Sequence, residues 1–431
     1  MQRLWEILYD WLALPLLWLL IRAMGLFNAK VRRGIRGRTG LMESLSRSLA
    51  HLPPGKRIWF HSSSMGEFEQ AKPIIAMLKA RSPDVMVIVT FFSPSGYEHS
   101  RAYHLADVIS YLPFDTRRSA RQFLSLVKPD IAVMVRYDIW PNHIWELRRR
   151  GVPTLIANAT MRRSTKRRLP FVRTFHRYVY DCIDEILTVS TSDVEAFSYF
   201  GLRHSLLLAI GDTRFDQVCK RSEDARKKNL IAPHVVKDKQ VLVVGSSWPE
   251  DDEVVIPSLL ELQSDRFLTF ITPHEPTIEH LEELEAQLEG RISFIRFSDL
   301  NDYTNERVVI VDSIGILLTL YRYAHIAYVG GSFRQGVHNV LEAAVYGIPV
   351  LFGPRHRNAH EPLQLLNKGG AFVVENSAEL TRTLRNLLDD TLARTTAGRR
   401  AAEFVQENVG ATARFLDHLT SYLHRTEEPQ V

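Results

Sequence analysis

The feature that most constrains this chain is an alternation of short apolar runs with helical patterns, which begins near residue 56. Ten runs have the length and β-branched composition of buried strands, in two series of five. The first series is 57–61, 85–91, 131–135, 154–157 and 186–189, and the second is 241–245, 267–272, 308–311, 326–330 and 349–353. Strands that are apolar throughout and separated by helices are typical of parallel sheets covered on both faces. The sequence therefore predicts an α/β protein with two doubly wound, Rossmann-like domains.

The strand pattern lapses into a polar stretch at 211–228, where we place the boundary between the predicted domains. We expect an N-terminal anchor with a basic flank at 1–50, a first Rossmann-like domain at 51–212 and a second one at 213–431. The helical region 380–422 should close the second domain, and it can also pack back across the first. Open parallel sheets bind ligands beyond the carboxyl ends of their strands, so we expect the active site in a cleft between the domains.

Charge is distributed unevenly, although the net charge is only +5. Residues 28–42 contain five Lys or Arg, residues 147–180 contain ten, and neither segment contains an acid, so the rest of the chain carries −10. Two basic faces on an otherwise acidic protein favour an anionic partner.

Cys182 and Cys219 are too few for a disulfide framework or a four-thiolate zinc site, which favours a reducing compartment.

The segment 4–27 is the most apolar stretch and contains three of the seven tryptophans. Its uncharged run, between Asp10 and Arg22, has 11 residues and would span about 17 Å as a helix, against about 30 Å for a bilayer core. We therefore predict a membrane anchor, either interfacial or a tilted span, with the cations of 30–38 on the cytoplasmic side. The alternative is a helix packed on the domain. A cleaved signal peptide is not expected, because the positive cluster follows the apolar run.

The first predicted strand is followed by a polar loop, 61–69, which contains a Gly–Glu pair. A glycine beside a carboxylate at the carboxyl end of a parallel strand is where open α/β sheets place catalytic groups. Backbone N–H groups and hydroxyls of the loop could hold an oxyanion while Glu67 acts as a general base. The alternative is that Glu67 or Glu69 only stabilises a helix N-terminus.

A second motif, Gly330-Gly331-Ser332, is followed by His338, Asn339 and Glu342. A glycine pair after a strand lets the backbone approach a phosphate, and a helix beginning near residue 338 would direct its positive end there. Asn339 and Glu342 would share one helix face, where Glu342 could accept hydrogen bonds from a ribose diol. The motif predicts nucleotide binding, with a tight turn and a capped helix as the structural alternative.

Three further loops follow strands of the second series and would face the same crevice. They are Gly245-Ser246-Ser247, Thr272-Pro273-His274-Glu275 and Asp312-Ser313-Ile314-Gly315. The sequence has no P-loop, no dinucleotide fingerprint, no nucleophile elbow and no metal-ligand spacing. We therefore expect chemistry without a metal ion.

Several ordered motifs, together with the apolar segment and its basic flank, resemble the 3-deoxy-D-manno-octulosonic acid (Kdo) transferases of Gram-negative bacteria. The resemblance covers nearly the whole chain. The matching motifs are those at 64–67, 93–98, 111–115, 140–142, 211–216, 330–332, 338–342 and 352–354.

The resemblance implies an inverting glycosyltransferase of the GT-B type that moves Kdo from CMP-Kdo onto a lipid A precursor (lipid IVA), without a cofactor, at the cytoplasmic face of the inner membrane. It implies that Glu67 is the general base and that the second domain binds CMP. The residues assigned to CMP are Gly245, Ser246, Pro273, His274, Ser313, Ile314, Gly315, Gly330, Gly331, Ser332, His338, Asn339 and Glu342. The residues assigned to Kdo or the acceptor are Ser64, Gly66 and Arg214, with Arg214 as the partner of the Kdo carboxylate.

The chain also departs from the family pattern. Where many members have Glu-x-Glu, it reads Arg136-Tyr137-Asp138, so a second catalytic carboxylate rests on Asp138 alone. His274 stands where an arginine is usual. The basic segment 147–180 is interpreted as a rim of the acceptor cleft that attracts lipid phosphates and the anionic leaflet. Two alternatives are open: another GT-B envelope enzyme that uses a UDP-sugar, and a non-catalytic membrane or nucleic-acid binder. A nucleic-acid partner is not expected, because the aromatic residues form no evident base-stacking motif.

Overall fold

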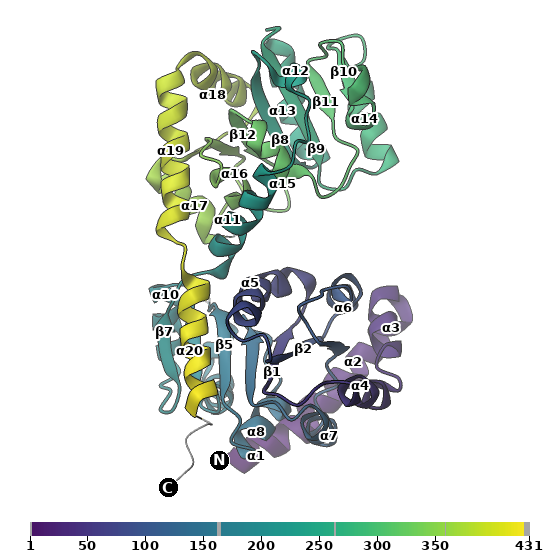
Figure 1. Cartoon of the computed structure of the whole chain (residues 1–431), viewed down its shortest axis with the longest axis vertical. Helices are drawn as coiled ribbons and strands as arrows, with labels where there is room; N and C mark the ends of the chain where they lie inside the picture. Colours follow the sequence, from purple (N-terminus) through teal and green to yellow (C-terminus); the bar gives the residue numbers. More distant parts are fainter. Residues whose placement is uncertain (1, 162–164, 263, 358, 426–431) are drawn as a thin grey trace. The chain divides into compact units, whose positions relative to one another are not determined.

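The computed structural model describes residues 2–161, 165–262, 264–357 and 359–425 (Figure 1). The chain forms two compact units. Unit 1 comprises the residues up to Gln217 together with those from Val409 onward, and unit 2 comprises Val218–Asn408. Each unit contains a seven-stranded sheet in which every pairing is parallel. The predicted α/β class, with two doubly wound sheets, is confirmed.

Unit 1 is built on a sheet of strand order β3-β2-β1-β4-β5-β6-β7. Its strands are β1 (Arg57–Ser62), β2 (Met86–Phe91), β3 (Val108–Tyr111), β4 (Ile131–Val135), β5 (Thr154–Ala159), β6 (Glu185–Thr188) and β7 (Leu206–Ala209). Its helices after β1 are α5 (Met65–Arg81), α6 (Pro94–Ser100), α7 (Arg117–Val127), α8 (Pro141–Arg149), α9 (Pro170–Tyr180), α10 (Thr191–Ser198) and α20 (Ala411–Arg425), with a short 3₁₀ turn at Lys166–Arg168.

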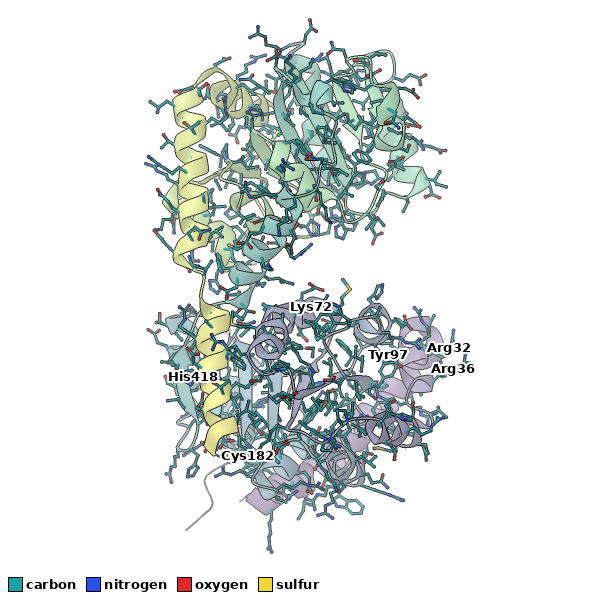
Figure 2. The ribbon with its side chains drawn as sticks, viewed as in Figure 1. Arg32, Arg36, Lys72, Tyr97, Cys182 and His418 are labelled. Atoms are coloured by element: carbon teal, nitrogen blue, oxygen red, sulfur yellow. The ribbon has the colours of Figure 1, made fainter. Side chains whose placement is uncertain are left out.

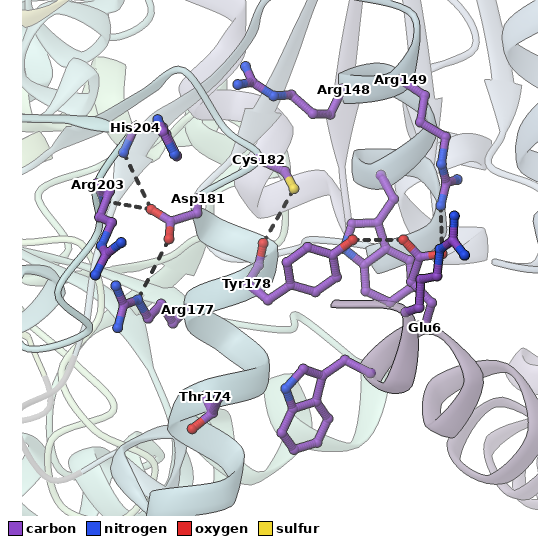
Figure 3. Close-up of a pocket in the computed structure, with 13 residues that line it drawn as sticks. Glu6, Arg148, Arg149, Thr174, Arg177, Tyr178, Asp181, Cys182, Arg203 and His204 are labelled. Carbon is purple, nitrogen blue, oxygen red and sulfur yellow. Dashed lines mark hydrogen bonds and ion pairs between the residues drawn. The ribbon is translucent and has the colours of Figure 1, made fainter. Parts of the chain in front are cut away.

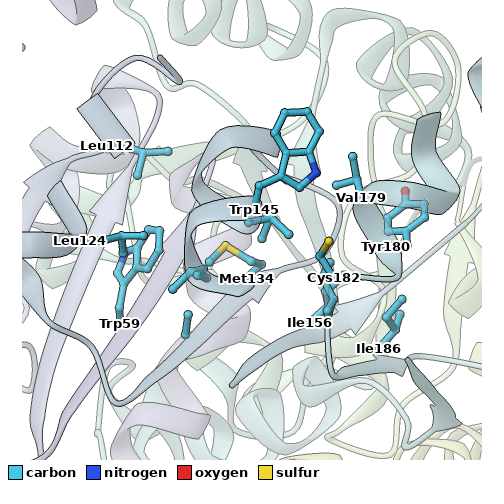
Figure 4. Packing of buried hydrophobic residues seen from close by; sticks show 14 of the residues in the cluster. Trp59, Leu112, Leu124, Met134, Trp145, Ile156, Val179, Tyr180, Cys182 and Ile186 are labelled. Carbon is cyan, nitrogen blue, oxygen red and sulfur yellow. The ribbon is translucent and has the colours of Figure 1, made fainter. Parts of the chain in front are cut away.

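The sheet of unit 1 is buried on both faces, because alternate residues of each strand contribute to two separate cores. Trp59, Met134 and Ile156 face one core, shown in Figure 4. The other core contains Phe60 and four residues from the C-terminal helix α20: Phe415, Leu416, Leu419 and Leu423. His418, labelled on α20 in Figure 2, also pairs with Glu185 of β6 at 2.7 Å. The last helix therefore completes the first unit.

Unit 2 has the strand order β10-β11-β9-β8-β12-β13-β14. Its strands are β8 (Gln240–Ser247), β9 (Phe267–Pro273), β10 (Phe294–Arg296), β11 (Val308–Ile310), β12 (Ile326–Val329), β13 (Val350–Phe352) and β14 (Ala371–Val373). Its helices are α12 (Pro233–Val236), α13 (Pro249–Glu261), α14 (Ile278–Leu288), α15 (Leu317–Leu320), α16 (Leu341–Ala344), α17 (His360–Lys368), α18 (Ser377–Asp389) and α19 (Thr391–Glu407), with 3₁₀ turns at Phe297–Asp302 and Tyr321–Tyr323. Helix α11 (Thr213–Arg226) begins in unit 1 and ends in unit 2.

The N-terminal segment is one helix in three parts: α1 (Gln2–Leu8), a π-helical turn (Tyr9–Ala13) and α2 (Leu14–Phe27). At Arg3–Phe27 it is long and apolar enough to cross a membrane, by length and composition alone. Its exposed apolar side chains are Leu4, Ile7, Leu8, Trp11, Leu12, Leu16, Trp18, Leu19, Leu20, Met24, Leu26 and Phe27.

Two short helices, α3 (Ala29–Arg36) and α4 (Leu41–Ala50), follow the N-terminal helix. Arg32 and Arg36 are exposed on α3 (Figure 2). Arg38, which we counted with them in the basic flank, instead turns inward: its guanidinium donates to the carbonyls of Gly34, Phe92 and Leu112. Burial lowers the pKa of Arg38 to about 10. This residue therefore holds α3 against unit 1.

Candidate functional site

Glu67 lies in the first turn of α5, directly after the loop that leaves β1. Its carboxylate accepts a hydrogen bond from the Ser63 N–H at 2.8 Å, and only 6% of the residue is exposed. Burial raises the pKa of Glu67, and the nearby charge of Asp138 adds to the rise; the Ser63 hydrogen bond, Arg136 and His61 act in the opposite direction. A carboxylate with a raised pKa is a better proton acceptor than an ordinary surface glutamate.

Asp138 follows β4, the neighbour of β1 in the sheet, and is held by a buried histidine. The His61 Nε2 lies 2.9 Å from the Asp138 Oδ2, and its Nδ1 lies 2.9 Å from the Thr90 Oγ1. Thr90 also accepts a hydrogen bond from the Trp59 indole N–H at 2.8 Å. With a neutral imidazole, Thr90 would donate to Nδ1 and Nε2–H would donate to Asp138, which satisfies every group.

Arg136 stands between β4 and Asp138 with a φ of +63°, a conformation that is costly for a residue with a Cβ. Among the residues that the structure describes, its buried Nε has no hydrogen-bond partner. A strained arginine with an unused donor beside two carboxylates is a candidate for binding an anionic substrate group. From the sequence, Arg136 was noted only as the replacement of an acid, and His61 was given no role. Neither residue was therefore predicted as part of the site.

The other residues predicted for this unit lie in two places. Ser64 directly precedes α5, and Gly66 is exposed in the first turn of that helix. A Cβ added to Gly66 would meet no atom within 4 Å. The space above Gly66 is therefore open to a ligand. Arg214 is already paired: its Nε and Nη2 donate to the Asp212 Oδ2 at 2.9 and 2.6 Å.

In unit 2, three of the four glycines assigned to the nucleotide are required by internal contacts, and the fourth, Gly315, has open space around it. An added Cβ would lie 2.0 Å from the Tyr321 hydroxyl at Gly245 and 2.4 Å from the Ser246 carbonyl oxygen at Gly330. Gly331 has a φ of +87°, and its N–H donates to the Asp251 Oδ2 at 2.7 Å. The Gly331 amide is thus occupied by a carboxylate of α13. The glycine pair shapes the turn after β12.

Three aromatic rings stack beside this turn. The His274 and His338 ring centroids are 4.3 Å apart, and Trp248 lies 5.0 Å from His274. The Trp248 indole N–H donates to the His338 Nε2 at 2.8 Å. Burial, together with the charge of His274, lowers the pKa of His338 to about 4, so the imidazole is neutral at physiological pH. A neutral ring that accepts at Nε2 carries its proton on Nδ1 and can donate it to a ligand.

The remaining predicted positions surround the ends of the unit 2 strands. Ser246 has a φ of +54°, Pro273 ends β9, and Ser313–Gly315 form the loop after β11, with Ile314 85% exposed. The Ser332 Oγ is buried and accepts from the Gly353 N–H at 2.6 Å.

The helix expected from residue 338 differs from the prediction. It is α16, which begins at Leu341 and has four residues. Asn339 therefore lies before the helix, where its side chain accepts from the Leu341 N–H at 3.2 Å. It shares no helix face with Glu342, which accepts from Arg221 at 3.4 Å. A four-residue helix offers little of the dipole that the sequence suggested.

The candidate residues of unit 1 and those of unit 2 occupy equivalent places in their sheets. In unit 1 they follow β1 and β4, and in unit 2 they follow β8 and β12. These strands are the central neighbours where the connections turn from one side of the sheet to the other. That is where doubly wound sheets bind ligands, beyond the carboxyl ends of the strands.

This chain is similar to known proteins in sequence and in fold. Residues 33–217 match the family described as 3-deoxy-D-manno-octulosonic-acid transferase (kdotransferase). The 3-deoxy-D-manno-octulosonic acid transferase of Haemophilus influenzae is 27% identical over 98% of this chain and 100% of its own length. The enzyme of the same name from Chlamydophila psittaci is 27% identical over 86% of both chains. The UDP-GlcNAc 2-epimerase of Neisseria meningitidis, bound to UDP-GlcNAc, has the same fold, with a TM-score of 0.60, 14% identity and coverage of 85% of this chain and 100% of its own.

The two doubly wound sheets, the fold likeness and the relatives that match along most of the chain lead to one conclusion. This chain has a GT-B fold, and it is similar over residues 33–217 and along most of its length to 3-deoxy-D-manno-octulosonic acid (Kdo) transferases, which are glycosyltransferases.

Proposed function

We propose that this protein transfers Kdo from CMP-Kdo to a hydroxyl group of a lipid A precursor, with inversion at the anomeric carbon. The acceptor oxygen forms the new bond to that carbon while the bond to the CMP phosphate breaks. Glu67 takes the proton from the acceptor hydroxyl, and CMP leaves with the electron pair. The observation that carries this proposal is the buried Glu67 carboxylate, with its raised pKa, beside Asp138 and Arg136.

The roles of the neighbouring groups follow from their chemistry. Asp138, held by His61, would orient the acceptor, and its charge keeps Glu67 basic. The Arg136 guanidinium, with its unused Nε, suits the carboxylate of a sugar acid better than Arg214, which Asp212 already occupies. In unit 2, the Nδ1–H of His338 would donate to the CMP phosphate, whose charge grows as the bond breaks.

A lipid acceptor is supported by a groove that joins the catalytic carboxylate to the apolar helix. This cavity, of about 360 Å³, is lined by Tyr9 and Leu17 of the N-terminal helix, by Asp138 and Trp140, and by Phe175 of α9. Its walls are mainly apolar, and the carboxylate, guanidinium and imidazole groups among them are those of Asp138, Arg167 and His176. An acyl chain entering beside Leu17 would therefore bring its polar head toward Asp138.

The polar contacts of the N-terminal helix favour an in-plane position on the membrane. Glu6 pairs with Arg117 and Arg149, the Tyr9 hydroxyl donates to Asp115 at 2.8 Å, and Asp10 accepts from Asn142 at 2.7 Å. A spanning helix would pull these acids away from their partners and into hydrocarbon, at a cost of roughly 3 kcal/mol for each one at the bilayer centre. We infer that the helix lies in the cytoplasmic interface of the inner membrane, with its exposed apolar side in the lipid.

The test is transfer from purified CMP-Kdo to a tetraacylated lipid A precursor, by wild type and by Glu67→Gln. We expect a Kdo-bearing lipid product from wild type and a loss of about 10²–10⁴-fold in the variant, because general base catalysis contributes that much. Donor competition by CMP and UDP separates this reaction from that of a UDP-sugar enzyme. A folded wild type that forms no product, and binds UDP but not CMP, would overturn the proposal.

A further inference from the structure

A second cavity of unit 1, of about 820 Å³, contains a concentration of arginines (Figure 3). It lies where the first turns of the N-terminal helix meet α8, α9 and the segment before β7. Two carboxylates, Glu6 and Asp181, are also part of its wall. The arginines that line it are Arg3, Arg148, Arg149, Arg177 and Arg203.

This cavity is separate from the candidate catalytic groups. Its residues lie in segments that lead into β5, β6 and β7, at the amino ends of the strands. Glu67 and Asp138 lie in segments that leave β1 and β4, at the carboxyl ends. Strands of four to six residues separate the two edges, which is roughly 13–20 Å. Arg148, Arg149 and Arg177 therefore belong to a different site from the acceptor rim in which we had placed them.

The positive charge of the cavity is only partly neutralised. Glu6 pairs with Arg149 at 2.7 Å and accepts from the Tyr178 hydroxyl. Asp184 lies 3.4 Å from Arg148, and Asp181 lies 3.7 Å from Arg177. Within the described part of the chain, no carboxylate oxygen lies within 4 Å of the side-chain nitrogens of Arg3 or Arg203. Three of the five arginines of this concave surface are thus ion-paired, and the charges of Arg3 and Arg203 leave it with a positive potential; guanidinium forks match phosphate oxygens.

The surroundings of the cavity identify the source of the phosphate. Arg3 and Glu6 belong to the same helix as the exposed side chains of Leu4, Ile7 and Trp11, which are 56%, 50% and 82% exposed. If this helix lies in the membrane interface, the cavity opens beside it at the depth of the headgroups. We propose that the cavity binds the phosphodiester headgroup of an anionic bilayer phospholipid and so anchors unit 1 to the membrane. The proposal rests on the membrane attachment proposed above.

The test measures flotation of the full chain with vesicles that contain no sugar donor or acceptor. The vesicles are pure phosphatidylcholine, or phosphatidylcholine with 30% phosphatidylglycerol or 30% oleate. The double variant Arg3→Gln/Arg203→Gln is compared with Arg382→Gln/Arg399→Gln, which removes two exposed charges of unit 2. We expect the cavity variant to lose about thirtyfold in affinity for phosphatidylglycerol vesicles, at roughly fivefold per arginine near the surface, and the control less than twofold.

The other outcomes overturn the proposal in distinguishable ways. An equal loss in the control would assign the effect to diffuse surface charge, and equal binding to oleate vesicles would remove the phosphate requirement. If 10 mM glycerol 3-phosphate abolished the preference for phosphatidylglycerol, the ligand would be a soluble phosphate and not a lipid. Failure of wild type to float with any vesicle would overturn the membrane attachment as well, and transfer activity would still be tested separately.

Discussion

The buried imidazole of His61 lies 2.9 Å from the carboxylate of Asp138, although the two residues are 77 positions apart in the sequence. His61→Phe removes this partner and leaves Asp138 free to turn. We expect kcat to fall by about tenfold or more while the KM for the sugar nucleotide stays the same, since we propose that the donor is bound by residues of unit 2. His61→Gln can still donate to Asp138 and should recover part of the loss. Steady-state kinetics of the two variants, with each kcat corrected for the fraction of folded protein, test this prediction. An equal loss of kcat in both variants would contradict it.

The pH dependence should reveal the charges around Glu67. The proposed base, Glu67, works only when it is deprotonated, so kcat/KM should fall as the pH is lowered through its raised pKa. Asp138→Asn removes a charge that raises this pKa and should move the acid limb to lower pH. Arg136→Gln removes a charge that lowers the pKa and should move the limb to higher pH. Rate profiles of the residual activities would test this pair, and shifts of the same sign would exclude Glu67 as the titrating base.

Trp248 should act as a positioning residue for His338. Trp248→Phe preserves the stacked ring and removes only the hydrogen bond to Nε2. We expect the KM for the donor to rise about threefold to tenfold, with kcat less affected, because one hydrogen bond is lost. Nitrogen-15 NMR should show mixed tautomers of His338 in the variant and a single Nδ1–H form in wild type. A wild-type ring that titrates near neutral pH would refute this assignment, because its pKa is about 4.

Gly331 should tolerate no side chain. An added Cβ would lie 2.6 Å from the Gly336 carbonyl oxygen, in a backbone with a φ of +87°. We expect Gly331→Ala to lower the free energy of unfolding by about 3 kcal/mol. Gly290→Ala is the matched control, because Gly290 has a φ of +67° but open space, and should cost only about 1 kcal/mol. Urea unfolding of both variants measures the difference, and equal costs would show that the contact is unimportant.

An in-plane helix keeps both of its ends on one side of the membrane. In a background with Cys182 and Cys219 replaced, Gln2→Cys should react with an impermeant maleimide in inverted membrane vesicles and not in intact spheroplasts. The reason is that Glu6 and Asp10 remain bound to unit 1. Labelling from the periplasmic side would show a spanning helix.

The sequence predicted the central strands and missed the edges. All ten predicted strands are present, and the four unpredicted ones, β3, β7, β10 and β14, are the outermost strands of the two sheets. An edge strand has one unpaired side, so its residues need not be apolar throughout. In β7, Leu206 and Leu208 are 47% and 40% exposed, and β10 has no fully buried residue. β10 and β14 have only three residues each, which is too short a run to detect, whereas β7 (Leu206–Ala209) is apolar throughout and was missed although its run is continuous.

The candidate site was foreseen unevenly for a similar reason. Glu67 was identifiable because its loop follows a strongly apolar strand. The pairing of His61 with Asp138, and of Trp248 with His338, depends on which strands become neighbours, and one chain alone does not specify that. The glycines of unit 2 were identified as special, but the reason is packing against Tyr321, Ser246 and Gly336. A glycine in a sequence shows that space is short without showing which atoms occupy it.

Because α20 packs in the core of unit 1, it affects how this unit folds during translation. Unit 2 is continuous in sequence, but the second core of unit 1 lacks Phe415, Leu416 and Leu419 until all of unit 2 has been synthesised. The 191 residues of Val218–Asn408 take about 10–40 s to synthesise at ordinary rates, and during this time the nascent unit 1 exposes an apolar surface. A messenger RNA truncated before codon 411 would encode every proposed catalytic group, but unit 1 would lack the helix that completes its second core.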